Sequence, residues 1–138
     1  MGKHTTNYIN TFIEVSENIK VSHDKNPITK KEKRTIAAIE YDLISRYPYR
    51  FTSDDLLFRV HAERHAITER EYTAEREKFF SQGQACLRAS PLTKTYGFGI
   101  HADEEGKLAL YGMEAKEYQA FLEDDSVKKI KAMRNARL

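Results

Sequence analysis

The chain has 138 residues, enough for one domain that buries its own hydrophobic core without disulfides or metals. Its 23 basic and 21 acidic residues leave a net charge of +2, which excludes the strong positive field typical of nucleic-acid-binding proteins. The single cysteine, Cys86, excludes an intramolecular disulfide and a cysteine-based zinc cluster, and no apolar run approaches the roughly 18 residues that span a membrane.

One strand and one helix are predicted in the first third of the chain. In residues 7–15, the apolar side chains of Ile9, Ile13 and Val15 fall on one face of an extended chain, which predicts a strand. The polar segment 16–28 predicts a loop. Thr29 and Glu32 have the spacing of a capping box, in which each side chain binds the other residue's backbone amide. A helix should therefore begin there and end before Pro48.

Two more helices should follow. The first is expected to begin near residues 52–53, where hydroxyl side chains precede two acidic ones. Phe58 departs from the apolar stripe of this helix, so we expect it either in a partner surface or packed across a helix junction. The capping-box spacing of Thr68 and Glu71 predicts a third helix over 69–82.

The last third of the chain predicts a β-hairpin and two helices. Residues 84–94 read as an irregular connection, and the segments 95–101 and 108–110 alternate as the two strands of a hairpin. One helix is expected over 114–123 and another after Ser126. The last segment is rich in basic side chains: Lys128, Lys129, Lys131, Arg134 and Arg137.

These elements predict the α+β class, with a small antiparallel sheet backed by helices. Because strands lie toward both ends of the chain with helices between them, the N-terminal strand should pair with the late hairpin. We expect one domain over 1–138, with a body of 4–123 and a basic C-terminal helix over 124–138.

Four stretches of the sequence are distinctive: HTTNYINTFIEV at 4–15, TSDD at 52–55, AER at 62–64 and CLRASPLTKTYGFGIH at 86–101. Together they resemble a family of small bacterial proteins known only as a domain of unknown function, over about His4 to Tyr118. The resemblance implies a bacterial, cytosolic protein. It brings no activity, substrate or catalytic residue that could be transferred to this chain.

The strongest candidate site lies within fourteen positions at the start of the hairpin. It combines two cations, two hydroxyls and an imidazole: Arg88, Ser90, Lys94, Tyr96 and His101. Arginine and lysine are well suited to hold a carboxylate or a phosphate. Gly97 and Gly99 leave one face of the strand bare, so a ligand could approach there; the alternative is that a helix packs on the glycines.

Two other groups of residues suggest metal binding or nucleophilic catalysis. His61 and His65 stand four residues apart and would share one face of a helix, but two ligands alone do not define a metal site. We therefore expect no metal and no cofactor, with this pair as the only candidates. Cys86 could act as a nucleophile beside His101, the alternative being a small apolar side chain in a reducing compartment.

The functional expectation is a cytoplasmic binding domain for a small anionic molecule, a carboxylate or a phosphate. One alternative is a small enzyme that uses the same surface with His101 as the acid or base. Another is a module that binds protein or RNA through the basic C-terminal helix, although nucleic acid is not the expected partner. No membrane partner is expected, a homodimer is left open, and the sequence does not decide whether the protein is an enzyme.

Overall fold

The computed structural model describes residues 5–29 and 33–135, and the fold is α+β as predicted. Two of its short helical elements, η1 and η2, are 3₁₀ turns. In chain order the elements are β1 Thr11–Glu14, α1 Ile36–Arg46, α2 Ser53–Arg64, η1 Glu69–Glu71, α3 Tyr72–Phe80, η2 Leu87–Ala89, α4 Pro91–Lys94, β2 Phe98–Ala102, β3 Leu108–Gly112, α5 Lys116–Glu123 and β4 Lys128–Lys131.

The four strands form one sheet in the order β3-β2-β1-β4. β2 and β3 make the predicted hairpin, and β1 pairs antiparallel with β2, so that Phe12 lies opposite His101. The expected pairing of the N-terminal strand with the late hairpin is therefore confirmed.

The basic segment near the C-terminus is a strand, so the prediction of a basic helix over 124–138 was wrong. β4 runs parallel to β1, with Ile130 opposite Ile13, which makes the sheet mixed rather than antiparallel. The amides of Lys128 and Ala132 donate to backbone carbonyls of the β1 strand and its flank at 2.9 Å. Pairing with the open edge of β1 outweighs the helix-favouring charge pattern of this segment. Residues 136–138 lie outside the described part of the chain.

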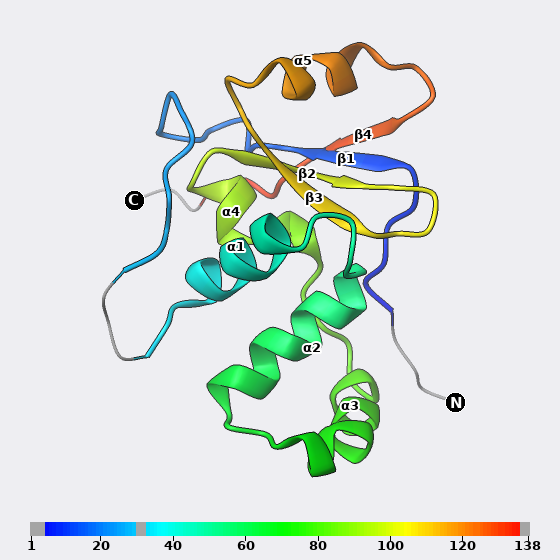
Figure 1. Ribbon diagram of the computed structural model, residues 1–138. Coiled ribbons are helices and arrows are strands. Elements are labelled where there is room, and N and C mark those ends of the chain that lie inside the picture. Colours follow the sequence, from blue (N-terminus) through cyan, green and yellow to red (C-terminus); the bar gives the residue numbers. More distant parts are fainter. Residues whose placement is uncertain (1–4, 30–32, 136–138) are drawn as a thin grey trace.

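The sheet is covered on both faces (Figure 1). Helix α5 lies on one face, where Phe12 packs against Tyr118 and Phe121. Helices α1 and α4 lie on the other face, where Ile13 and Ile100 belong to the main core. Neighbouring residues Phe12 and Ile13 are both fully buried for this reason.

Side-chain caps fix where the first two helices begin. α1 starts after Thr35, whose hydroxyl accepts from the amide of Ala38 at 3.1 Å. The predicted start at Thr29 was wrong, since Thr29 lies in a loop, and Glu32 is outside the described residues. α2 starts after Thr52 as predicted, and a complete capping box holds that end.

Helices α2 and α3 form a hairpin that extends away from the sheet (Figure 1). Phe58 is fully buried between these two helices with Ala62 and Phe80, so it packs across a helix junction and forms no exposed partner surface. The third helix is shorter than predicted, because η1 and α3 together end at Phe80. The segment 84–94, predicted as irregular, contains η2 and α4.

Within residues 5–29 and 33–135, no helix is long and apolar enough to cross a membrane.

Candidate functional site

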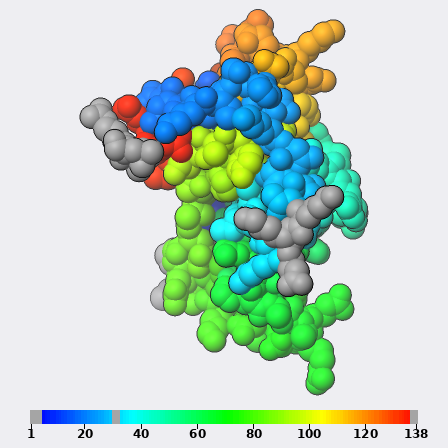
Figure 2. All heavy atoms as spheres, turned by 90° about the vertical axis from the view of Figure 1, so that its left-hand side faces the viewer, coloured from blue at the N-terminus to red at the C-terminus, as the bar shows by residue number. Residues whose placement is uncertain are grey.

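A pocket of about 250 Å³ lies between α1, α2, the end of α3 and the segment 84–91. Figure 2 views the molecule from the side on which that segment, in yellow-green, lies beside α1 in cyan and α2 in green. Most of the wall is apolar, with the side chains of Ile36, Leu57, Val60, Phe79, Leu87 and Pro91. Pockets of this kind, with a few polar groups on an apolar wall, are the usual form of a small-molecule site.

Glu40 is the most unusual group in the wall of this pocket. Its residue is only 2% exposed, yet it carries a carboxyl group. The hydroxyl of Ser90 donates to Glu40 Oε1 at 2.7 Å, and this is the only side-chain hydrogen bond of Glu40 among the described residues. Burial raises the pKa of Glu40 from its ordinary 4.5 to about 7, and the Ser90 hydrogen bond partly opposes that rise.

No positive side chain neutralises Glu40 within the described part of the chain. None of the ion pairs found there includes this carboxyl. Buried carboxylates in proteins are normally paired with a cation or bound to a metal. Glu40 therefore sits in an apolar wall with one oxygen bound to a hydroxyl and, among residues 5–29 and 33–135, without a counter-ion.

Sequence reasoning missed Glu40, although a signal was present. Ile36, Glu40 and Ile44 are spaced by four residues, so they lie on one face of α1. Ile44 is almost fully buried and Ile36 lines the pocket. An acidic residue in the apolar stripe of a helix is the pattern that could have identified it.

Ser90 is the one member of the predicted ligand set that touches Glu40. It stands at the N-cap of α4, where its hydroxyl accepts from the amide of Leu92 at 3.1 Å. The same hydroxyl donates a hydrogen bond to Glu40 Oε1. Ser90 thus fixes one carboxyl oxygen in place while it caps a helix.

Cys86 and the two histidines of α2 line the same pocket. Burial lowers the pKa of His61, and the neighbouring charge of His65 lowers it further; the two ring centroids are 4.4 Å apart. No group of three His, Cys, Asp or Glu side chains in the described ranges could hold a metal ion. The pair His61 and His65 therefore finds no third protein ligand there.

The other predicted ligand residues do not gather around the pocket. Arg88 Nε donates to the carbonyl of Lys131 at 2.7 Å, which ties η2 to β4. Tyr96 packs against the main core, and the carbonyl of Lys94 accepts from Asn135 at 2.9 Å. Arg88, Lys94 and Tyr96 therefore contact the core and the C-terminal segment, and none of the three lines the pocket that contains Ser90.

His101 lies on the opposite face of the sheet from the pocket. It stacks on Phe121 at 4.2 Å, and its Nδ1 shares a hydrogen bond of 2.8 Å with the hydroxyl of Tyr49. Burial lowers the pKa of His101. The sheet separates it from Cys86, so the structure does not bring together the predicted thiol and imidazole.

The bare strand face at Gly99 is filled by neighbouring rings. A Cβ atom added to Gly99 would lie 2.3 Å from Phe12 Cζ and 2.7 Å from Tyr118 Cε2. Helix α5, which carries Tyr118, packs there. The alternative that a helix packs on the glycines is thus confirmed for Gly99.

Comparison with protein families assigns the chain. The model of a family of unknown function, DUF6157, matches residues 3–138. The chain belongs to this family. Comparisons with curated proteins and with solved structures found no match.

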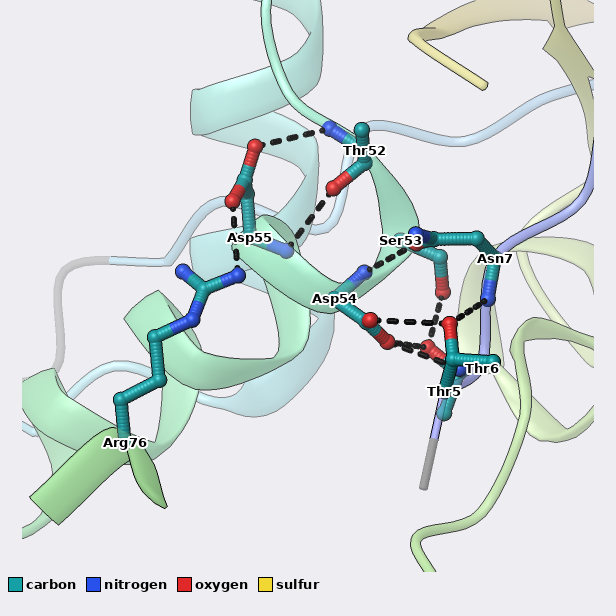
Figure 3. A network of polar contacts seen from close by, with 8 residues as sticks. All are labelled: Thr5, Thr6, Asn7, Thr52, Ser53, Asp54, Asp55 and Arg76. Atoms are coloured by element: carbon teal, nitrogen blue, oxygen red, sulfur yellow. Dashed lines mark hydrogen bonds and ion pairs between the residues drawn. The ribbon is translucent and has the colours of Figure 1, made fainter. Parts of the chain in front are cut away.

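Two of the stretches that carried the family resemblance meet at the start of α2 (Figure 3). The amide and hydroxyl of Thr6 donate to Asp54 Oδ1 at 2.7 and 2.8 Å, and the hydroxyl of Thr5 donates to Oδ2 at 2.9 Å. In return the amide of Asp54 donates to Asn7 Oδ1 at 2.8 Å. These bonds fasten the N-terminal segment to a helix end, so this part of the motif serves the fold.

Asp55 extends the same network to α3 (Figure 3). Its carboxylate accepts from the amide of Thr52 at 3.2 Å and from Arg76 at 2.9 Å. The guanidinium of Arg76 also lies over the ring of Phe80, 5.5 Å from its centroid. The TSDD stretch thereby holds together the N-terminus, α2 and α3, and with them one wall of the pocket.

Proposed function

We propose that the protein binds a small molecule in the pocket beside Glu40. The observation that carries the proposal is the position of this carboxyl: 2% exposed, in an apolar wall, without a cation among the described residues. Such a group lowers the stability of the native state, because its charged form is poorly solvated. Groups of this kind concentrate at functional sites in folded proteins.

The size of the pocket supports a ligand of one ring or a short chain. A cavity of about 150 Å³ is sufficient for benzene. At about 250 Å³, this pocket has room for a benzene-sized body with one short polar substituent.

Of the residues in the sequence hypothesis, Ser90 is the one that belongs to this proposed site. Arg88, Lys94 and Tyr96 make contacts with the core and the C-terminal segment, and His101 lies across the sheet. The alternative of a protein- or RNA-binding helix rested on a C-terminal helix that β4 replaces.

Cys86 provides the test, since it is the only cysteine of the chain and it lines the pocket. We would follow its alkylation by iodoacetamide with benzylamine, benzyl alcohol or phenylacetate present, and record native mass spectra of freshly purified protein. A saturable decrease in the alkylation rate with one of these probes, or a co-purified small molecule, supports the proposal. If no probe protects Cys86 and no ligand co-purifies, the proposal is wrong.

A second candidate is a small enzyme in which Glu40, rather than His101, exchanges protons with the bound molecule. The pKa of Glu40 of about 7 favours it, because an acid–base group works best when its pKa is near the working pH. The two candidates differ in turnover. An enzyme returns a chemically changed molecule after incubation, detected by its mass or its NMR spectrum, and a binding protein returns it unchanged.

A further inference from the structure

We infer that the ligand of this pocket presents a positively charged amine to Glu40. The inference rests on the proposed binding function and specifies the chemical class of the ligand. We base it on the hydrogen-bond donors and the charges around the Glu40 carboxyl.

Among the described residues, one side-chain hydrogen bond reaches the Glu40 carboxyl. A carboxylate has two oxygens and can accept several hydrogen bonds. Oε1 receives the Ser90 hydroxyl, whereas Oε2 has no side-chain donor among the described residues. A ligand with an ammonium group supplies N–H donors to the free oxygen together with the missing positive charge.

The energetics favour a cation over a neutral donor. In a low-dielectric wall an ion pair is much stronger than in water, provided that the partner also satisfies the carboxylate's hydrogen bonds. A neutral hydroxyl supplies one ordinary hydrogen bond and leaves the negative charge uncompensated. An anionic ligand would bring a second negative charge beside Glu40.

The other polar side chains that line the pocket are more exposed than Glu40. Arg64 at the end of α2 and His65 directly after it are exposed, whereas His61 and Cys86 are partly buried. Water and salt screen exposed charges, so the positive charge of Arg64 weakens the binding of an amine less than Glu40 strengthens it.

The experiment compares three probes of similar shape on three proteins. We would measure dissociation constants of benzylamine, benzyl alcohol and phenylacetate by NMR shift titration at pH 8. The proteins are the wild type, Glu40→Gln and the control Glu123→Gln, which changes an exposed glutamate on α5. Benzylamine should bind at least about tenfold more tightly than benzyl alcohol to the wild type and the control, and this ratio should fall to near one in Glu40→Gln.

A pH series gives an independent readout if Glu40→Gln does not fold. In the wild type, benzylamine should bind more tightly at pH 8 than at pH 6, because Glu40 loses its proton in that range, while benzyl alcohol should bind almost equally. His61 and His65 line the same pocket, so the series is repeated with both changed to Asn. The pH effect on benzylamine should persist in that variant.

The outcomes separate the two proposals. If benzyl alcohol binds as tightly as benzylamine, or phenylacetate binds most tightly of the three, the amine inference is overturned and the pocket remains a binding site. If none of the probes binds, both the ligand class and the binding function are contradicted.

Discussion

Glu40 should make the stability of the protein fall as the pH rises through the weakly acidic range. Its pKa is about 7 in the native state and 4.5 when it is solvated, so between these values the native protein holds a proton that the unfolded chain has lost. Stability decreases with pH wherever the native state binds more protons than the unfolded state. Carboxyl groups that form salt bridges act in the opposite direction.

The size of the effect follows from the two pKa values. At about 1.4 kcal/mol for each pKa unit, the difference between 4.5 and about 7 corresponds to about 3 kcal/mol of stability lost by pH 8. Most of this loss should occur between pH 5 and pH 7. The replacement Glu40→Gln removes the titration, and it keeps an oxygen that can accept the Ser90 hydrogen bond.

The assay is urea unfolding at pH 5, 6, 7 and 8 for the wild type, Glu40→Gln and Glu123→Gln. The free energy of unfolding of Glu40→Gln should gain about 2 to 3 kcal/mol relative to the wild type between pH 5 and pH 8. His61 and His101, whose pKa values are lowered, change stability with the opposite sign, but they are present in all three proteins and cancel in the difference.

A difference between Glu40→Gln and the wild type that stays constant from pH 5 to pH 8 would refute this reasoning. It would mean that Glu40 has an ordinary pKa in the native protein, and therefore that its carboxyl is solvated or paired. The control Glu123→Gln changes an exposed side chain, so its free energy of unfolding should stay within about 0.5 kcal/mol of the wild type.

Three further predictions concern the fold. Asp54→Ala removes the acceptor of three hydrogen bonds from the N-terminal segment and should lower the free energy of unfolding by about 2 kcal/mol; an unchanged urea midpoint would contradict the fastening role. Gly99→Ala should cost about 3 kcal/mol or prevent folding, because the new methyl group overlaps two buried rings, whereas Gly83→Ala, with open space around it, should stay within about 0.5 kcal/mol of the wild type. In hydrogen exchange, the amides of Lys128 and Ala132 should be protected, and protected and unprotected amides should alternate between them. Uniform protection over the segment would indicate a helix instead.

Local signals in the sequence were sufficient for much of the fold. The hydroxyl and acidic side chains at 52–55 predict the start of α2, and the structure shows a capping box between Thr52 and Asp55 there. The alternation around Phe98 and Ile100 predicts the hairpin, because the two strands are neighbours in the chain. Both features depend on residues that are close together in the sequence.

Features set by distant partners were not predictable in the same way. The segment around Ile130 carries the charges of a helix end, and it becomes a strand because β1, more than a hundred residues earlier, offers an open edge. Phe58 departs from the expected stripe of α2, but α3 covers it. The candidate site was missed because a glutamate is most often exposed, and the Ser90 that hydrogen-bonds to Glu40 lies 50 residues later in the chain.

The most direct test of the binding site is a crystal structure of the protein soaked with benzylamine. We predict that the benzylamine ring lies in the pocket between α1, α2 and residues 84–91, with the amine nitrogen within about 3 Å of the Glu40 carboxyl. Well-occupied benzylamine elsewhere on the protein, with the pocket beside Glu40 empty, would contradict it.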